Sequence, residues 1–438
     1  MTRSDIEIMA PAGNFECLRA AIQGGADSVY FGVGQLNMRS HSANNFSVED
    51  LPEVCAVCRE HGVKSYLTLN VVVYDEEIGE ARRLLDAARQ AGISAVIASD
   101  MAVITYARSI GLEVHLSTQL NISNVEALRF YAQFADVAVL ARELTLSQVK
   151  AISEAVKREN ICGPSGRPIR LEMFVHGALC MAVSGKCYLS LHEHGASANR
   201  GSCYQVCRRR YEVTDVETGY ALEIDNQYIM SPKDLCTIEF VDKIVDAGVR
   251  VFKIEGRARS AEYVRTCACC YRRAADAVIR DLAAPGIPAG TGQRHFTPAL
   301  AASLKEELST VFNRGFWDGY YQGARLGEWS DAYGNRATRR KEYVGKVTNW
   351  FGKLSVAEIL VETGQIKTGD TLLVTGATTG VVEWTVGEVR VDLRPVDCAL
   401  KGEYCSIAFP PEAFGTDGLA APKLHRGDKV YLWKAVAG

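Results

Sequence analysis

The first 285 residues alternate between short apolar runs and longer segments with the apolar spacing of amphipathic helices. The short runs are apolar on both faces, which is typical of parallel strands buried beneath helices. The pattern predicts eight strands, over Ile6–Met9, Ser28–Val33, Lys64–Val73, Ala95–Ala98, Glu113–Ser117, Val137–Leu140, Arg170–Val175 and Val249–Glu255.

Helical patterns follow most of these strands, and several end in a glycine before the next strand. The predicted helices cover Phe15–Gly24, Val48–His61, Glu76–Ala91, Met101–Ile110, Val125–Phe134, Leu146–Arg158 and Ala261–Ala283. Eight strand–helix units in this length predict an α/β fold of the TIM-like (β/α)8 barrel type. A doubly wound sheet is the weaker alternative because no G-x-G-x-x-G follows the first strand.

The pattern changes after the last predicted helix. Gly286–Thr297 is rich in glycine and proline, as linkers are, and Ala299–Phe312 has a helical pattern. From Tyr343 onward, short strands separated by turns predict a small antiparallel β-barrel. The predicted organisation is a barrel over 1–285, a linker and helical segment over 286–342, and a C-terminal β-barrel domain over 343–438.

Composition narrows the classes of function. The formal net charge of −3 over 438 residues excludes a general polycation, so any nucleic-acid contact needs a local basic patch. We see neither a signal-peptide pattern nor an apolar stretch of the length that a membrane helix needs, and we expect a cytoplasmic protein. In a reducing compartment, fourteen cysteines favour packing, metal or redox roles over disulfides.

Polar residues follow several predicted strands, at the end of a barrel where function resides. They are Asn14, Asn70, Asp100, Gln119, Asn121, Arg142, Glu143, His176, Glu255 and Arg257. Asn14 and Asp100 directly precede helical patterns and are predicted to cap them. Of the whole set, we expect at least two to line a ligand pocket.

The segment Glu172–Tyr211 holds the strongest chemical signal. Cys180, Cys187, Cys203 and Cys207 are separated by six, fifteen and three residues, among Gly, Ser, Asn and Arg. No helix or strand period places these four in a core. The other cysteines that we weighed fall within helical or strand patterns and are predicted to pack: Cys55, Cys58, Cys267, Cys269, Cys270, Cys398 and Cys405.

Four thiolates suit either tetrahedral zinc or an iron–sulfur cluster. The six-residue gap is loose for a zinc knuckle and favours a [4Fe–4S] cluster. Zinc remains an alternative, with His176, His192 or His194 as a possible ligand. A third interpretation is a nucleophilic cysteine that uses His176 as its base.

Several ordered motifs resemble the collagenase-like peptidase family U32. They are M-A-P-A-G-N-F-E-C-L-R-A-A-I-Q-G-G-A-D-S-V-Y-F-G from Met9, L-A-R-E-L-T-L from Leu140, the cysteine segment, S-P-K-D-L from Ser231 and K-I-E-G-R from Lys253. The resemblance runs from the N-terminus to about residue 280, and the last domain resembles that family's C-terminal domain. In length, this chain is similar to members of the branch that hydroxylates tRNA wobble uridine. Members of the ribosomal RNA branch are longer, and members of the ubiquinone branch are shorter.

The resemblance implies that Cys180, Cys187, Cys203 and Cys207 hold a [4Fe–4S] cluster in a tRNA-modifying hydroxylase. We expect the pocket to place a flipped base and a small carboxylate co-substrate, such as prephenate, which an arginine fork can bind. The residues predicted to do so are Arg142, Glu172, His176, Glu255 and Arg257.

Arginines near the cysteines could hold RNA phosphates. We predict this role for Arg200, Arg208, Arg209 and Arg210, with Arg339, Arg340 and Lys341 as a second patch. The alternative for these runs is a solvated face paired with acidic residues. Two rival functions stay open: a peptidase, although no G-x-S-x-G or H-E-x-x-H is present, and an RNA-binding module with structural zinc.

Overall fold

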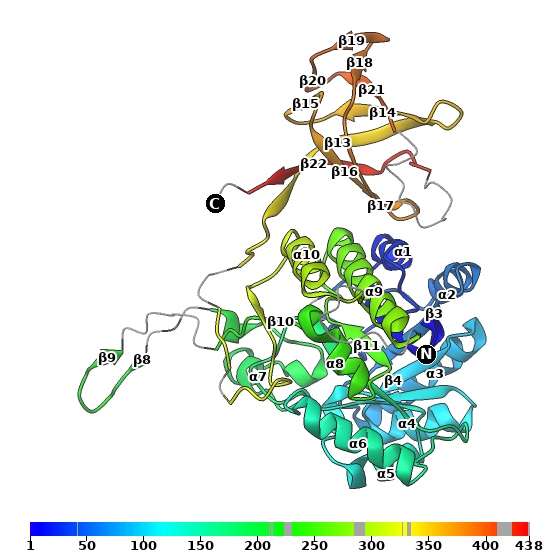
Figure 1. The fold of residues 1–438 in the computed structure, drawn as a ribbon, viewed down its shortest axis with the longest axis vertical. Coiled ribbons are helices and arrows are strands. Elements are labelled where there is room, and N and C mark those ends of the chain that lie inside the picture. The colour runs from blue at the N-terminus through cyan, green and yellow to red at the C-terminus, as the bar shows by residue number, and fades with distance from the viewer. Residues whose placement is uncertain are drawn as a thin grey trace.

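The computed structural model describes residues 1–41, 43–209, 211, 213–222, 230–283, 294–325, 327–330, 334–409 and 423–436. Its larger part is a closed barrel of eight parallel strands surrounded by helices (Figure 1). The strands follow one another in chain order from β1 to β7, and β11 pairs with both β7 and β1 to close the barrel. They are β1 (Glu7–Pro11), β2 (Ser28–Gly32), β3 (Lys64–Leu69), β4 (Ala95–Ala98), β5 (Glu113–Leu116), β6 (Val137–Val139), β7 (Arg170–Gly177) and β11 (Val251–Ile254).

Each strand lies beneath helices, and β1, β2, β4, β6 and β11 are buried throughout. The predicted (β/α)8 barrel is confirmed. The prediction succeeds since strands that are apolar on both faces must be covered on both sides. Asn14 and Asp100 cap their helices, accepting from the backbone N–H of Cys17 and Ala102. The helices around the barrel are α1 (Phe15–Gln23), α2 (Leu51–Glu60), α3 (Ile78–Ala91), α4 (Met101–Ser109), α5 (Val125–Ala132), α6 (Leu146–Arg158), α8 (Val241–Asp246) and α9 (Ala261–Ala283). None of the helices in the described ranges combines the length and apolar character needed to cross a membrane.

The segment that follows α9 packs onto the barrel. Helix α10 (Pro298–Ser309) begins one residue before the predicted helix, ends three residues before its end, and contacts α9. Strand β12 (Phe316–Trp317) pairs with β10 (Asp234–Cys236), which runs antiparallel to the end of β7. The described part of the predicted 286–342 segment therefore extends the barrel's sheet and helical layer. A separate hairpin, β8 (Val213–Thr214) with β9 (Ala221–Leu222), projects from the body (Figure 1).

The C-terminal domain is antiparallel, as predicted, and has its own apolar core. One sheet has the strand order β17-β16-β22-β13-β14-β21-β18-β19, and a second pairs β15 with β20. Among the described residues no pairing joins the edge strands β17 and β19, so the hydrogen-bonded sheet is not a closed barrel. The bounds are β13 (Arg339–Phe351), β14 (Val356–Val361), β15 (Gln365–Lys367), β16 (Thr371–Gly376), β17 (Gly380–Thr385), β18 (Val389–Val391), β19 (Arg394–Val396), β20 (Cys398–Leu400), β21 (Tyr404–Ala408) and β22 (Lys429–Ala435).

The C-terminal domain rests on helices α1 and α9 of the barrel (Figure 1). The side chain of Gln23 in α1 donates to the carbonyl of Thr379 at 2.9 Å and accepts from the N–H of Val381 at 2.8 Å. An ion pair of 3.0 Å joins Lys341 to Glu262 of α9. These directed bonds fix the turn between β16 and β17 against the barrel.

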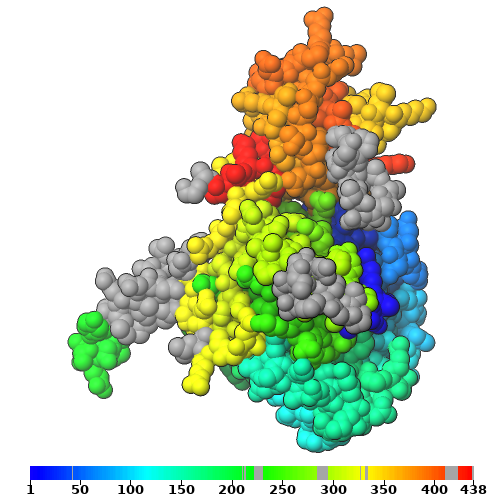
Figure 2. Space-filling model, viewed as in Figure 1, coloured from blue at the N-terminus to red at the C-terminus, as the bar shows by residue number. Residues whose placement is uncertain are grey.

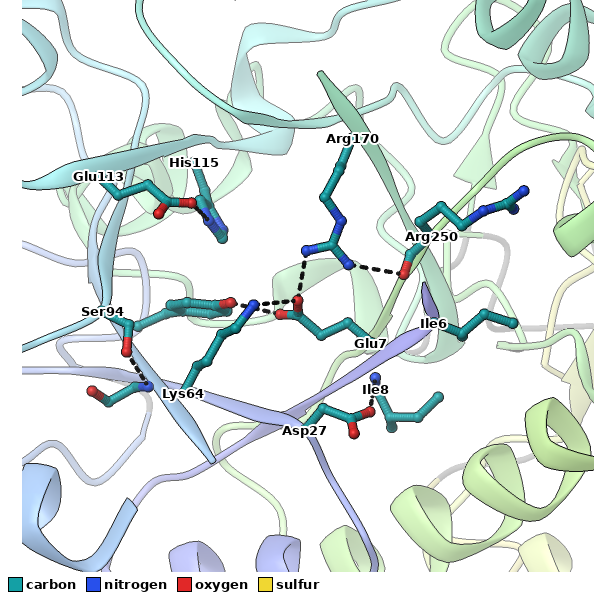
Figure 3. A network of polar contacts seen from close by, with 12 residues as sticks. Ile6, Glu7, Ile8, Asp27, Lys64, Ser94, Glu113, His115, Arg170 and Arg250 are labelled. Atoms are coloured by element: carbon teal, nitrogen blue, oxygen red, sulfur yellow. Dashed lines mark hydrogen bonds and ion pairs between the residues drawn. The ribbon is translucent and has the colours of Figure 1, made fainter. Parts of the chain in front are cut away.

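An ionic cluster occupies the amino-terminal end of the barrel, where β1, β3 and β7 begin (Figure 3). Glu7, only 3% exposed, accepts hydrogen bonds from Tyr66 at 2.6 Å, Arg170 at 2.8 Å and Lys64 at 3.2 Å. Burial alone would raise the pKa of Glu7, but the charges of Arg170 and Lys64 outweigh it and lower that pKa to about 2. The cluster ties three strands together at the end opposite the one where barrel enzymes work.

Candidate active site at the mouth of the barrel

A cavity lies at the carboxyl ends of the barrel strands. Residues of β2, β3, β4, β7 and β11 form its walls, together with the segments that follow six of the eight strands. Polar residues predicted at strand ends line it: Asn70, Gln119, Arg142, Glu255 and Arg257. The sequence pattern therefore located the pocket and part of its polar lining.

Glu255 lies among cations in this cavity. Arg39 donates to Glu255 Oε1 at 3.0 Å, and the hydroxyl of Tyr30 lies 3.4 Å from Oε2. Burial alone would raise the pKa of this carboxyl group, but the charges of Arg39, Arg142 and Arg257 outweigh it and lower the pKa. Glu255 is thus a carboxylate at neutral pH and serves as a counter-ion for the arginines.

Arg257 is held rigidly in the cavity wall. Its Nη1 donates to Asn37 Oδ1 at 3.0 Å and to Thr68 Oγ1 at 2.9 Å. Burial lowers the pKa of Arg257 to about 10, so the group remains a cation at neutral pH. Its neutral hydrogen-bond partners leave the positive charge available to an anion.

Lys253 and Glu172 form a buried ion pair inside the barrel, with 2.7 Å between Nζ and Oε1. The ammonium also lies over the rings of Tyr30 and Phe174, at 4.9 and 5.4 Å from their centroids. Lys253 lines the cavity but Glu172 does not, because Glu172 precedes Phe174 by two residues and sits deeper in the barrel. The prediction that Glu172 lines the pocket is therefore corrected: it acts on the cavity only through Lys253.

Arg142 presents unused donors to the cavity. Its guanidinium carbon stands 3.9 Å from the centroid of the Phe174 ring, and Nη1 lies 3.4 Å from the carbonyl of Ala178. Its Nε is buried with no hydrogen-bond partner. Within the described residues Arg142 forms no ion pair, so a planar cation is available to a carboxylate.

His176 does not line the cavity, which corrects the sequence prediction. The pairing of β7 with β11 shifts register there, and His176 lies opposite Ile254 instead of continuing the inward alternation of Glu172 and Phe174. Its ring packs against two tyrosines of α9 and Phe316 of β12. Burial lowers the pKa of His176 to about 3, so it is a neutral packing residue at physiological pH.

All four cysteines of the predicted ligand set line the same cavity: Cys180, Cys187, Cys203 and Cys207. They lie between β7 and β8, in a segment that contains the short helix α7 (Leu189–His194) and two 3-10 turns. Cys180 is exposed and the other three are half-buried. The segment thus places thiols beside the cationic wall.

Two contacts clamp this cysteine segment onto the barrel. Arg208 donates to Ser231 Oγ at 2.9 Å and to the carbonyl of Leu179 at 2.7 Å. Gly201 has φ of +90°, and a Cβ there would lie 1.9 Å from Ser40 Oγ. The cysteine segment therefore packs closely against the loop that carries Arg39.

The donor set fits a thiolate-ligated metal centre by its chemistry. Burial raises the pKa of Cys187 and Cys207, and the neighbouring cysteine charges add to this rise. Arg39 interacts electrostatically with Cys203, and Arg208 with Cys207. Over the described ranges, no three Cys, His, Asp or Glu side chains stand close enough to hold one metal ion, so binding would require the segment to draw its thiols together.

The histidines considered as zinc ligands do not reach the cavity. His176 faces α9, and neither His192 nor His194 is among the cavity-lining residues. His194 instead packs against Tyr204, with 4.7 Å between ring centroids. Cysteines predicted to pack are buried at Cys55, Cys58, Cys267, Cys270 and Cys405, whereas Cys269 and Cys398 are half-buried.

The arginines predicted to hold RNA phosphates are mostly engaged within the protein. Arg200 pairs with Glu77 and stacks on a tyrosine ring, and Arg208 is used by the clamp described above. Arg209 pairs with Glu193. Arg210 lies outside the described residues. Nearby acceptors already take donors of Arg200 and Arg208, and a role of these arginines in holding RNA phosphates stays a prediction.

The second predicted patch is likewise neutralised. Arg339 pairs with Glu383 at 2.9 Å, Arg340 with Glu342 at 2.8 Å and Lys341 with Glu262 at 3.0 Å. Each carboxylate comes from an adjacent strand or from α9, a pairing that the sequence run of three cations did not reveal. The alternative, a face paired with acidic residues, describes this patch correctly.

Sequence reasoning missed many residues of the cavity, among them Tyr30, Arg39 and Lys253. Lys253 carried a signal, because it is a cation within the apolar strand V-F-K-I. Tyr30 lies in a similarly apolar strand, where a tyrosine gives no warning. Arg39 lies in the loop between β2 and α2, where no periodicity indicates which side chain turns inward.

The chain is similar to a family model and to several named relatives. Residues 13–331 match peptidase family U32. A Porphyromonas gingivalis protein named collagenase is 57% identical over 98% of this chain and 99% of its own length. The Bacillus subtilis tRNA hydroxylation protein P1 is 34% identical, covering 78% of this chain and 77% of its own. The Escherichia coli 23S rRNA 5-hydroxycytidine C2501 synthase is 36% identical over 74% of this chain and 46% of its own.

Proposed function

The chain belongs to peptidase family U32, and on that premise we propose that it is an iron–sulfur-dependent enzyme that hydroxylates the wobble uridine of tRNA. The observation that carries the proposal is the convergence of four cysteines and a cationic wall on one cavity at the mouth of the barrel. Relatives whose names describe tRNA or rRNA hydroxylation support the reaction class.

Cys180, Cys187, Cys203 and Cys207 would hold a [4Fe–4S] cluster, which supplies one-electron redox chemistry when bound. A small carboxylate co-substrate, such as prephenate, would bind the free guanidinium of Arg142. Arg39 lies near Cys203 and Arg208 near Cys207, so these two arginines would offset the charge of the cluster's thiolates.

The remaining cavity residues position these partners. Arg257, fixed by two neutral hydrogen bonds, adds positive charge for an anion, and Glu255 holds Arg39 in place. Glu172 orients the Lys253 ammonium beneath the aromatic rings. Ile97 adds apolar lining to the same cavity. The barrel therefore offers a preorganised anion site next to the proposed cluster.

Metal content tests the cofactor. Protein purified without oxygen should contain about four irons and matching sulfide per chain. Cys203→Ala should lose most of the iron, whereas Cys162→Ser, a half-buried cysteine outside the cavity, should keep it. Full iron content in Cys203→Ala would show that the ligand assignment is wrong, and one zinc per chain would favour the structural-zinc alternative.

Nucleoside analysis tests the substrate. Total tRNA from a strain that lacks the gene, and also lacks any oxygen-dependent or paralogous hydroxylase, should lose 5-hydroxyuridine derivatives. The wild-type gene should restore them, and a gene carrying Arg142→Ala should not. An unchanged nucleoside profile in the deletion strain would contradict tRNA as the substrate.

Peptidase activity is a second candidate, favoured by the 57% identity to a protein named collagenase. Against it, no histidine lies among the described residues that line the cavity, so its serines and cysteines lack an imidazole base. Purified protein should therefore leave gelatin and collagen peptides intact. Cleavage that copurifies with the wild-type chain and disappears in Cys180→Ala would support the peptidase instead.

A further inference from the structure

A groove on the C-terminal domain combines exposed cations with aromatic rings. It lies between the β13–β14 hairpin and the segment that leads into β22. Its lining residues are Thr348, Asn349, Trp350, Glu358, Tyr404, Lys423, Leu424, His425 and Arg426. We propose that this groove binds single-stranded nucleic acid, through phosphate contacts to its cations and stacking of bases on its rings.

The cations of the groove differ from those of the neighbouring surface. Lys423 and Arg426 are exposed, and neither forms an ion pair with any described residue. At the opposite end of β13, by contrast, Arg339 and Arg340 are both paired with carboxylates. Unpaired cations that converge on one groove are available to phosphates, whereas paired ones are already neutralised.

The single carboxylate of the groove is engaged locally. Glu358 Oε1 accepts a hydrogen bond from Thr348 Oγ1 at 2.7 Å. Both residues lie on the paired strands β13 and β14, across the groove from the cationic segment. Glu358 forms no ion pair with Lys423 or Arg426 among the described contacts, and the two cations outnumber this one carboxylate in the groove.

Two aromatic rings lie beside these cations. The ring of Trp350 is fixed edge-on against Phe409, with 5.5 Å between centroids and 90° between planes. Tyr404 is 54% exposed, so its ring face is open to a stacking partner. Rings placed next to phosphate-binding cations are the combination that single-strand-binding proteins use, because every base has a face that can stack.

The adjacent hairpin extends this surface. At its tip Phe351 is 41% exposed and Leu354 is 73% exposed, with Lys353 between them. Figure 2 shows the yellow tip of this hairpin projecting from the C-terminal domain. Apolar and cationic side chains therefore continue beyond the groove, along the path that an extended strand would follow.

The groove is tied to the barrel through Thr379. The hydroxyl of Thr379 lies 3.1 Å from His425 Nδ1, and it also donates to Asp428. The carbonyl of the same residue accepts from Gln23 of α1 at 2.9 Å. A strand bound in the groove would therefore be held at a fixed distance from the barrel, which suits a surface that grips part of a larger RNA.

Fluorescence anisotropy with the full-length protein tests the inference. The probe is a labelled single-stranded RNA of mixed sequence and about 12 nucleotides, within the range of about 4–16 nucleotides that single-strand-binding domains cover. The double variant Lys423→Glu/Arg426→Glu should weaken binding at least tenfold and flatten the slope of log K against log salt by about 1.4. The control Lys367→Glu/Lys401→Glu changes the same net charge on exposed, unpaired cations outside the groove and should bind like wild type.

Tyr404→Ala tests stacking without disturbing the core and should weaken binding by about fivefold or more. A DNA probe of the same sequence shows whether the groove prefers RNA or DNA. Binding of either probe supports the proposal that the groove binds single-stranded nucleic acid. Equal affinity of the groove and control variants would overturn the inference. Displacement of the probe by polyglutamate as readily as by unlabelled RNA would also overturn it, in favour of an acidic protein partner.

This inference does not rest on the proposed reaction. Cys203→Ala should leave binding at the groove unchanged, because that residue lies on the barrel cavity. Absence of hydroxylation by the wild-type protein, with intact groove binding, would count against the reaction alone. Intact hydroxylation with unchanged affinity in the groove variants would count against the groove alone.

Discussion

Replacing Glu7 with glutamine should destabilise the barrel through a loss of charge at nearly constant shape. Glu7 begins β1 and accepts from Tyr66, Lys64 and Arg170, which come from β3 and β7 (Figure 3). A glutamine can still accept from the Tyr66 hydroxyl. It cannot balance the two cations, although Lys64 is 53% exposed and can turn to water.

The magnitude follows from the pKa of Glu7, which falls from 4.5 to about 2 on folding. At about 1.4 kcal/mol per pH unit, this difference corresponds to roughly 3 kcal/mol of stability for the ionised carboxylate. Because the folded pKa is depressed, the stabilisation is fully present above about pH 4.5 and is lost as the pH falls toward about 2. Glu7→Gln should therefore cost roughly 3 kcal/mol at neutral pH and progressively less in acid.

Urea denaturation followed by far-ultraviolet circular dichroism measures this difference. All α-helices in the described ranges lie outside the C-terminal sheet domain, so the helical signal reports the barrel. Glu126→Gln is the matched control, because Glu126 is 79% exposed in its ion pair and should change stability by less than about 0.5 kcal/mol. A difference between wild type and Glu7→Gln that stays constant from neutral pH to about pH 3 would refute the electrostatic reasoning.

The cavity yields three more predictions. Gly201→Ala should lower the iron content, since its Cβ would collide with Ser40. Gly62→Ala, also at positive φ but in open space, should keep the iron, and iron analysis of both variants tests this. Arg142→Lys should weaken binding of a carboxylate co-substrate about tenfold, because an ammonium cannot replace the planar, bidentate guanidinium. Calorimetric titration measures this affinity, and an unchanged value would contradict the prediction. His176→Gln should lower thermal stability but leave the pH profile of the reaction unchanged between about pH 5 and 8. A shifted pH profile would indicate that His176 is a catalytic group after all.

The barrel was predictable because its elements obey strong local rules. Strands covered on both sides must be apolar on both sides, and the predicted Ser28–Val33 and Ala95–Ala98 match β2 and β4 to within one residue. The helical periods were long enough to fix Leu146–Arg158 and Ala261–Ala283 at both ends. Pocket residues at strand ends followed from the barrel rule, since parallel strands bring all their carboxyl ends to one face.

What failed depended on partners far apart in the chain. The shift in register between β7 and β11 turned His176 outward, and strand alternation contains no signal for such a shift. Arg200 is neutralised by Glu77, more than a hundred residues away in sequence. A run of cations in the sequence indicates positive charge in one segment, but only the structure shows whether each cation is paired. The candidate nucleic-acid surface is therefore the groove with Lys423, and not the patch with Arg339, which is paired with Glu383.

The charge balance of the cavity links its two halves. Five cations line it, with Glu255 as the one carboxylate among the described lining residues and the deeper Glu172 paired with Lys253: Arg39, Arg142, Arg208, Arg257 and Lys253. A surplus of cations in a partly buried space is costly unless anions offset it. Cysteines in the same wall can provide that offset only as thiolates, which metal binding favours, and a bound carboxylate can offset the rest. The cationic wall and the cysteine segment therefore support each other's proposed roles: the metal-bound thiolates should weaken anion binding relative to metal-free protein, whose thiols are neutral, and co-substrate titrations of the two forms would measure the difference.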